Sequence, residues 1–264
     1  MQDVSRLIAD GDLDEALRNT QQLIRQNPAE PKSRILLFQL YCLFGQWDKA
    51  LTQLNVLRDL DKSTLLMVGT YEQVLQCEAL RKDVFAGLKT PLIFGEPREW
   101  LALLLEALKL ENNGNYQQAA QMRVQALEQA PATSGSVDGT PFAWIADADS
   151  RLGPCLEAIM NGRYYWIPFM QIGKIQLEPP TDLRDLVWVP AHFTWVNGGE
   201  ADGLIPTRYS GSDASDDPRI RLSRLTDWQA VADGIVHGLG QRLLATDVDD
   251  YALLDLRLIE LASE

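Results

Sequence analysis

The sequence Gly45-Gln-Trp47-Asp-Lys-Ala50 sets the architecture of the first half of the chain, because its pattern returns twice. The same order of glycine, polar residue, large apolar residue, two polar residues and alanine is found at Gly11 to Ala16 and at Gly114 to Ala119. The first two glycines are 34 positions apart, which is the tetratricopeptide period, and the next interval of 69 is close to two periods. The spacing predicts all-α helical hairpins, with a degenerate unit between the second and third copies.

Each part of this pattern has a physical role in a helical hairpin. Glycine permits the tight turn, and the small alanine lets the two helix backbones approach closely. Pro28 and Pro131 each follow the alanine of their copy by 12 positions, where this repeat ends its second helix. Trp47 and Tyr116 occupy the large apolar position and are expected in the core. The pattern itself implies no catalysis.

A stack of such hairpins has a concave face, and repeat proteins use that face to hold a peptide or helix of a partner. The first helix of each hairpin lines this face. The candidate partner-binding residues are therefore Arg34, Phe38, Tyr41 and Tyr71. For Phe38 and Tyr41, an ordinary core position is the alternative interpretation.

The composition changes after Pro131, where a polar, glycine-containing segment predicts a linker near residues 134–140. We expect a tetratricopeptide-like domain over residues 1–134 and a smaller, Trp-rich, acidic domain over residues 141–264. Short β-prone runs and a helix at Ser150 to Asn161 predict an α+β fold for the second domain, rich in strands and with a barrel-like sheet as one option. Five tryptophans suit either its core or an aromatic interface: Trp144, Trp166, Trp188, Trp195 and Trp228.

The formal net charge of −13 argues against nucleic acid and anionic membranes as partners, because both carry the same sign of charge. Residues 136–264 carry 20 acidic and 10 basic side chains, so most of the excess belongs to the second half. Neither a signal peptide nor a membrane-spanning stretch is predicted. The three cysteines form no ligand or disulfide pattern, which favours a reduced, cytoplasmic setting.

The usual motifs of catalysis give little support to an enzyme. His192 and His237 are far apart in the sequence, and the common nucleotide-binding and nucleophile motifs are missing. Asp147 and Asp149 could bind a divalent ion or act as acid and base, although a cluster at the start of a helix explains them as well. We therefore predict a non-enzyme with no catalytic residue, cofactor or metal. The alternative is a metal-dependent hydrolase using the Asp147/Asp149 region with Arg151 and His192.

Four phrases of the second half carry a family resemblance. They are Asp147-Ala-Asp-Ser-Arg-Leu-Gly-Pro154, Asn161-Gly-Arg-Tyr-Tyr-Trp-Ile-Pro168, Glu178-Pro-Pro-Thr-Asp-Leu-Arg-Asp-Leu-Val-Trp188 and Leu204-Ile-Pro-Thr-Arg-Tyr209. Together with the repeats in front, they resemble the ImpE/TagJ family, and the likeness runs nearly from end to end.

The resemblance implies a cytoplasmic accessory protein of the type VI secretion system. Members of this family bind the N-terminal helix of the small sheath subunit and are linked to sheath recycling by an AAA+ ATPase. They carry no established catalytic residues, so none is transferred to this sequence. A scaffold that docks the ATPase directly through the acidic C-terminal domain is the remaining alternative.

Overall fold

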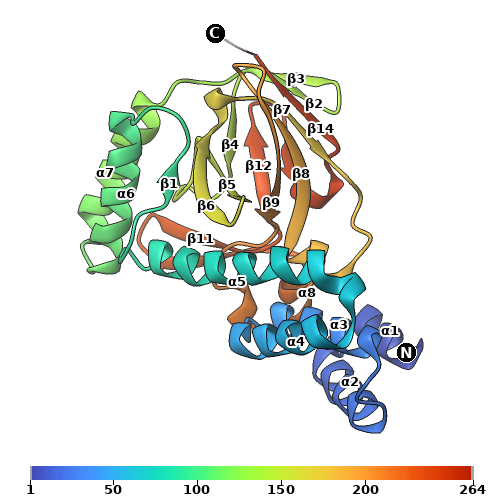
Figure 1. Cartoon of the computed structure of the whole chain (residues 1–264). Helices are drawn as coiled ribbons and strands as arrows, with labels where there is room; N and C mark the ends of the chain where they lie inside the picture. The colour runs from blue at the N-terminus through green and yellow to red at the C-terminus, as the bar shows by residue number, and fades with distance from the viewer. Residues whose placement is uncertain (1, 263–264) are drawn as a thin grey trace.

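The computed structural model describes residues 2–262 as a helical half packed against a strand-rich half (Figure 1). Helices α1 to α5 open the chain, and α6 and α7 follow an extended segment. Their bounds are α1 Gln2–Asp10, α2 Leu13–Gln26, α3 Pro31–Leu43, α4 Trp47–Leu60, α5 Leu65–Phe85, α6 Glu99–Asn112 and α7 Tyr116–Gln129, with a 3-10 turn at Lys62–Thr64. The predicted helical hairpins are therefore present.

The repeated glycines lie in the turns between paired helices. Gly11, Gly45 and Gly114 have φ values of 85°, 63° and 78°, a region that residues with a Cβ rarely adopt. The repeated alanines are fully buried between the helices: Ala16, Ala50 and Ala119. Tyr116 is 39% exposed, so its predicted core position is wrong. It begins α7, the last helix of this half. The main packing partner of α7 is α6.

The region between the second and third copies differs from the expected degenerate hairpin. It holds the long helix α5, which ends before Gly87 at φ 69°, and then an extended segment. Pro91 and Pro97 in that segment prevent helix until Glu99, because proline lacks the N–H that a helix interior needs. Part of the segment forms strand β1 (Leu92–Ile93), which pairs in parallel with β6 of the other half.

The strand-rich half contains a nine-stranded sheet in the order β1-β6-β5-β9-β8-β7-β14-β2-β3, a three-stranded sheet β13-β12-β4 and a ribbon β10-β11. The strands beyond β1 are β2 Gly135–Val137, β3 Thr140–Phe142, β4 Ile145–Asp147, β5 Cys155–Met160, β6 Arg163–Pro168, β7 Ile172–Leu177, β8 Trp188–Trp195, β9 Glu200–Pro206, β10 Thr226–Ala232, β11 Ile235–Gly240, β12 Leu243–Thr246, β13 Asp250–Ala252 and β14 Leu258–Leu261. The one α-helix described there is the short α8, Pro218–Arg221.

The large sheet is open, so the barrel-like option is wrong. Its two edges, β1 and β3, are not paired with each other. Strand β1 has only two residues, and β3 contains Pro141, which cannot donate a ladder hydrogen bond. Both features oppose closure of the sheet.

The helix expected at Ser150 to Asn161 is also wrong, because this region forms strand β5. All six residues of β5 are buried, so the strand lacks the alternation of polar and apolar residues that marks a half-exposed strand. A short apolar run of this kind cannot be told from a helix by its periodicity.

The polar segment expected as a linker carries β2, a turn and β3. Strand β2 pairs with β14 near the C-terminus, so residues 135–142 belong to the large sheet. The division of the chain at residues 134 and 141 stays a prediction, since β1 from the first half joins the same sheet.

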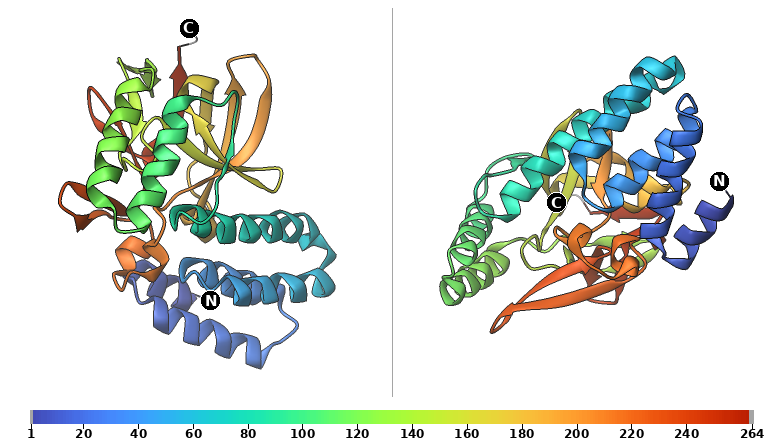
Figure 2. Two further views of the ribbon diagram at one scale, coloured as in Figure 1. Left: turned by 90° about the vertical axis from the view of Figure 1, so that its left-hand side faces the viewer. Right: turned by 90° about the horizontal axis from the view of Figure 1, so that it is seen from below.

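The two halves meet along α5, which runs beneath the sheet with α1 to α4 packed below it (Figures 1 and 2). Helices α6 and α7 stand beside the sheet. Trp166 and Trp188 are fully buried in the core that the two halves share, whereas Trp144 and Trp228 are each 39% exposed. Over residues 2–262, no helix combines the length and apolar character needed to cross a membrane.

Candidate functional site

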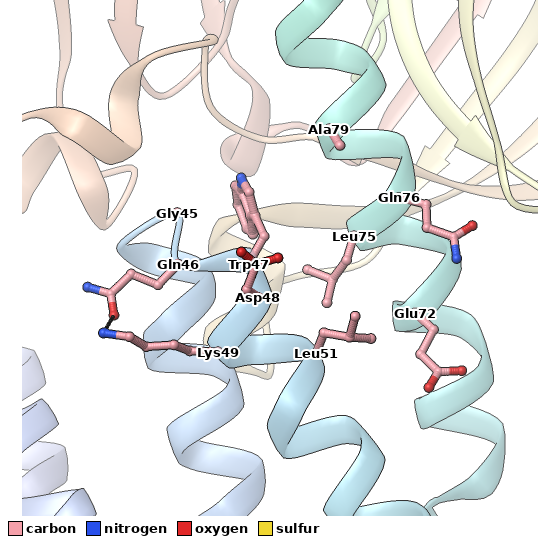
Figure 3. Close-up of a pocket in the computed structure, with 10 residues that line it drawn as sticks. All are labelled: Gly45, Gln46, Trp47, Asp48, Lys49, Leu51, Glu72, Leu75, Gln76 and Ala79. Atoms are coloured by element: carbon pink, nitrogen blue, oxygen red, sulfur yellow. Dashed lines mark hydrogen bonds between the residues drawn. The ribbon is translucent and has the colours of Figure 1, made fainter.

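A surface groove of about 480 Å³ lies between the start of α4 and the middle of α5 (Figure 3). It is formed where the second turn of the repeat pattern, at Gly45, faces the long helix α5. Its lining residues are Gly45, Gln46, Trp47, Asp48, Lys49, Leu51, Glu72, Leu75, Gln76 and Ala79. The helical repeats therefore leave a hollow that is open to a partner.

The floor of this α4–α5 groove is apolar. Leu51 of α4 and Leu75 of α5 point toward one another across it (Figure 3). Leu51 is 37% exposed, whereas Leu75 is 5% exposed. The apolar floor therefore extends from the protein surface at Leu51 to the core at Leu75. Trp47 closes one end, half-buried, and Ala79 leaves that end of α5 free of bulk. An apolar face of a helix or peptide fits this surface.

The rim of the groove is polar and carries both signs of charge. Lys49 donates to Gln46 at 2.9 Å and lies over the ring of Tyr41 at 5.7 Å from its centre. Glu72 forms an ion pair with Arg58 of α4 across the far end. Such a rim gives orientation to a bound segment, and it contains no pairing of nucleophile and base.

An aromatic stack beneath the groove joins it to the sheet. Trp47 packs on Trp188 of β8 with 5.9 Å between ring centres, and Trp188 packs on Tyr71 at 5.7 Å. Tyr71 meets Phe38 edge to face at 5.5 Å. The predicted partner-binding residues Phe38 and Tyr71 are thus brought together, but inside the core, with exposed fractions of 0% and 7%. Burial raises the pKa of Tyr71 to about 12.

The other two predicted residues lie apart from that pair. Tyr41 is buried and accepts a hydrogen bond from Gln21 at 3.2 Å. Arg34 is partly exposed on α3, donating to the carbonyl of Pro28 at 3.0 Å and to Gln53 of α4 at 3.2 Å. These four residues stabilise the packing of α2 to α5, and their contact with a partner stays a prediction.

Buried charges lock α5 onto the sheet. Glu78 of α5 accepts the indole N–H of Trp188 at 2.7 Å. Arg81, one turn further, donates to both carboxylate oxygens of Glu157 on β5, at 2.6 and 3.0 Å, and to the carbonyl of Arg208 at 2.8 Å. A bidentate arginine pair of this kind fixes geometry as well as charge. The position of the groove wall therefore depends on residues of the strand-rich half.

The same cluster continues into the sheet. Arg242, just before β12, is fully buried and donates to both Asp147 and Glu157. Burial alone would raise the pKa of Glu157, but Arg81 and Arg242 outweigh it and hold the pKa at about 2. For Asp147 burial prevails over the opposing effect of Arg242 and raises the pKa to about 6. Both carboxylates are occupied by guanidinium groups.

Comparison with known proteins agrees with this architecture. Residues 7–64 match a tetratricopeptide repeat model, and residues 139–260 match the model of the ImpE protein family. Over 254 residues the chain is 47% identical to the type VI secretion system accessory component TagJ of Pseudomonas aeruginosa, covering 96% of this chain and 89% of that relative. The chain belongs to the ImpE family. A crystal structure of a Vibrio parahaemolyticus protein shares its fold, with a TM-score of 0.91 at 24% identity over 99% of this chain and 98% of that one.

This ImpE-family relationship confirms the resemblance carried by the four C-terminal phrases, and it supports an accessory role in type VI secretion. Three of those phrases contain buried residues that are bonded to the charge cluster: Asp147 in the first, Tyr164 in the second and Trp188 in the third.

The residues of the hydrolase alternative take part in ion pairs and hydrogen bonds within the fold. Asp149 is paired with Arg151 at 2.5 Å and accepts the N–H of Gly238 at 2.8 Å, so its oxygens are engaged within this ImpE-family fold. His192 lies on β8, where it contacts Asp202 at 2.7 Å. Across residues 2–262, no group of three or more His, Cys, Asp or Glu side chains is placed to hold a metal ion.

The four partner-binding residues predicted from the sequence are not among those that line the α4–α5 groove. Leu51, Leu75 and Ala79 line it but were not nominated, because the repeat rule favours first helices while the groove opens between α4 and α5. The one sequence feature that could have indicated the groove is Ala79, a small residue one helical turn after the large Leu75. That signal is too common to identify a groove without the structure.

Proposed function

We propose that this ImpE-family protein is a non-catalytic accessory component of a type VI secretion system that holds the N-terminal helix of the small sheath subunit in the α4–α5 groove. The observation that carries the proposal is the open apolar floor between two helices, with Leu51 exposed beside the more deeply buried Leu75. An amphipathic helix presents one apolar face, which this floor can bury while its polar face meets the charged rim.

The four residues nominated from the sequence act in this proposal through the shape of the groove. Phe38, Tyr41 and Tyr71 are buried and hold α3, α4 and α5 in register, and Lys49 at the rim lies over Tyr41. Arg34 is partly exposed on α3 and joins it to α4 through its hydrogen bond to Gln53, and we propose that its exposed part contacts the partner outside the groove.

Cooperation with the AAA+ ATPase in the cytoplasm is the second part of the proposal. The excess of acidic side chains in residues 136–264 favours a basic docking surface on that enzyme. Retention of the ATPase by the immobilised full chain should then fall steeply as salt is raised. Retention that does not respond to salt would leave the groove proposal intact and remove this one.

Titrating the protein with a peptide tests the main proposal. A fluorescently labelled peptide covering the N-terminal helix of the small sheath subunit should bind the full chain and saturate in an anisotropy experiment. Leu51→Asp places a charge on the apolar floor, and we expect binding to weaken at least about tenfold, or about 1.4 kcal/mol.

Leu66→Asp is the matched control. Leu66 lies on α5 outside the groove and is 84% exposed, so the same substitution there should leave the affinity unchanged. Binding that is absent at high micromolar concentration, or equal in the Leu51→Asp and unaltered proteins, would contradict the proposal.

A further inference from the structure

The ribbon β10-β11 contains the longest open strand edge of the structure described for residues 2–262. Strand β10 has seven residues, and five in succession, Asp227 to Val231, are exposed. The edges of the other sheets are short: β1 has two residues, and β3, β4 and β13 have three each. The ribbon extends from the body of the molecule as an arm (Figure 2, right). Proteins normally shorten or block such an edge.

Only one edge of the ribbon is covered. On β11, the N–H of Gly238 donates to Asp149 at 2.8 Å and the N–H of Gly240 donates to Ser212 at 2.8 Å. The carbonyl of Gly240 accepts from Tyr209 at 3.0 Å. Three outward groups of β11, at Gly238 and Gly240, are therefore satisfied by the body of the protein.

The alternation of an antiparallel ladder identifies the outward groups of β10. Gly238 is opposite Trp228 and Gly240 is opposite Thr226, so these are the pairs whose backbone groups point away from the partner strand. By the same alternation, the N–H and C=O of Ala230, opposite Val236, point to the free edge. The N–H of Trp228 is met only by the neighbouring Asp227 carboxylate at 2.8 Å. The edge thus offers backbone donors and acceptors at alternate residues.

The arm is held in a fixed place. Trp228 packs on Tyr209 with 5.8 Å between ring centres, yet it stays 39% exposed. On the opposite face, His237 contacts Glu111 of α6 at 2.5 Å, and Glu111 also binds Arg123 of α7 at 2.6 Å. An ordered edge costs less entropy on binding than a flexible one, so these contacts favour strand addition.

The charge of the edge indicates what pairs with it. Asp227 and Asp233 stand at its two ends, and residues 226–233 contain no lysine, arginine or proline of the kind that protects other edges. The nearby Arg219 is already paired with Asp217 at 2.7 Å. Strand β10 has a register shift between Ala230 and Ala232 and ends before Asp233. In antiparallel pairing with a second copy, the acidic residues at opposite ends of the two edges would approach one another, and like charges brought together are destabilising. Lysine or arginine at both ends of a partner strand would be stabilising.

We propose that the free edge of β10 binds an extended segment of another protein by strand addition, and that this segment carries basic residues flanking a β-prone apolar stretch. The outward carbonyl of Trp228 and the outward N–H and C=O of Ala230 give the hydrogen bonds. The exposed face of Trp228 receives an apolar side chain, and Asp227 and Asp233 pair with the flanking cations. This surface is separate from the α4–α5 groove and does not rest on the function proposed for it.

A model peptide tests the edge directly. The probe is a labelled Lys-Val-Thr-Val-Thr-Val-Lys peptide, titrated into the full chain at low salt. It should saturate, whereas the same peptide with glutamate at both ends, or with proline at its centre, should bind at least about tenfold more weakly. Leu51→Asp, the groove variant, should bind the basic peptide unchanged.

Two variants assign the binding to β10. Ala230→Pro removes an outward N–H without breaking the ladder to β11 and should weaken binding at least about tenfold. The double variant Asp227→Lys, Asp233→Lys should reverse the preference toward the glutamate-flanked peptide, and it decides the matter if circular dichroism shows that Ala230→Pro does not fold. The proposal is overturned if the basic peptide does not saturate the protein, or if the double variant still prefers the basic peptide. It is also overturned if sedimentation shows a dimer that Ala230→Pro converts to a monomer, because the edge would then bind a second copy of the chain.

Discussion

Glu157 shows how single residues hold the two halves together. Its carboxylate is fully buried and accepts from Arg81, Arg242 and the hydroxyl of Tyr164. Removing one member of a buried charge cluster leaves the others unpaired, which costs far more than the pair contributes when intact. The energetic role of this residue is therefore best seen by substitution.

We predict that Glu157→Gln lowers the free energy of unfolding by about 3–5 kcal/mol at neutral pH, measured by urea denaturation. The reason is that Arg81 and Arg242 lose their shared anion. Glu72→Gln is the control, since Glu72 is paired with Arg58 near the surface and should cost less than about 1 kcal/mol. Equal losses in the two variants would contradict this role of Glu157.

The same residue predicts a pH dependence. The pKa of Glu157 is about 2 in the folded chain against 4.5 when unperturbed, so the unfolded state takes up its proton first. The stabilisation is present above pH 4.5 and is lost as the pH falls toward 2. Unfolding midpoints of the unaltered protein should fall over that window more steeply than those of Glu157→Gln. Parallel profiles would show that other groups dominate.

At the scale of elements, the turns of the repeat differ in how much they tolerate a side chain. Gly45 connects α3 to α4 at φ 63°, and a Cβ there would lie 2.1 Å from the carboxylate of Asp213. Gly114 connects α6 to α7 at φ 78°, where a Cβ would meet nothing within 4 Å. One turn is packed against the strand-rich half and the other faces open space.

We expect Gly45→Ala to lower the free energy of unfolding by more than about 2 kcal/mol, because backbone strain adds to the clash with Asp213. Gly114→Ala carries the backbone strain alone and should cost about 1–2 kcal/mol. Thermal or chemical denaturation of the two variants side by side makes the comparison. A larger loss for Gly114→Ala would mean that the loop around Asp213 moves away without cost.

At the scale of the whole molecule, the halves share one core. Arg208 of the strand-rich half donates to the carbonyls of Leu43 and Cys42, at 3.0 and 3.1 Å, at the end of α3. A cation at this end of a helix complements its dipole. Together with the Arg81–Glu157 pair, this contact places buried polar groups of each half in the core that the two halves share.

The shared core predicts a single unfolding transition. Far-ultraviolet circular dichroism, which follows mainly the helices, should give the same midpoint as tryptophan fluorescence, which reports Trp166 and Trp188 among others. Arg81→Met should shift both midpoints together. Two separated transitions, or a shift in one signal alone, would show that the halves unfold independently.

The strand-rich half shows where prediction from the sequence succeeded and failed. The strand-rich character of this half was predicted because β-prone runs are a local feature of the sequence. The sequence predicts a helix where strand β5 lies, because burial of both faces of the strand removes the alternation of polar and apolar residues. The open edge of β10 was not predicted, because a strand does not encode which of its edges is covered.

The sequence alone determined the helical hairpins, through glycine at the turns and alanine between the helices, and it identified the family through phrases such as Asn161 to Pro168. These features are local, and local chemistry is readable in a chain. The tertiary structure decided that Phe38, Tyr41 and Tyr71 are core, that the groove opens between α4 and α5, and that Asp147 and Glu157 are held by Arg242. Each of these depends on contacts between residues far apart in sequence, and such contacts exist only once the chain has folded.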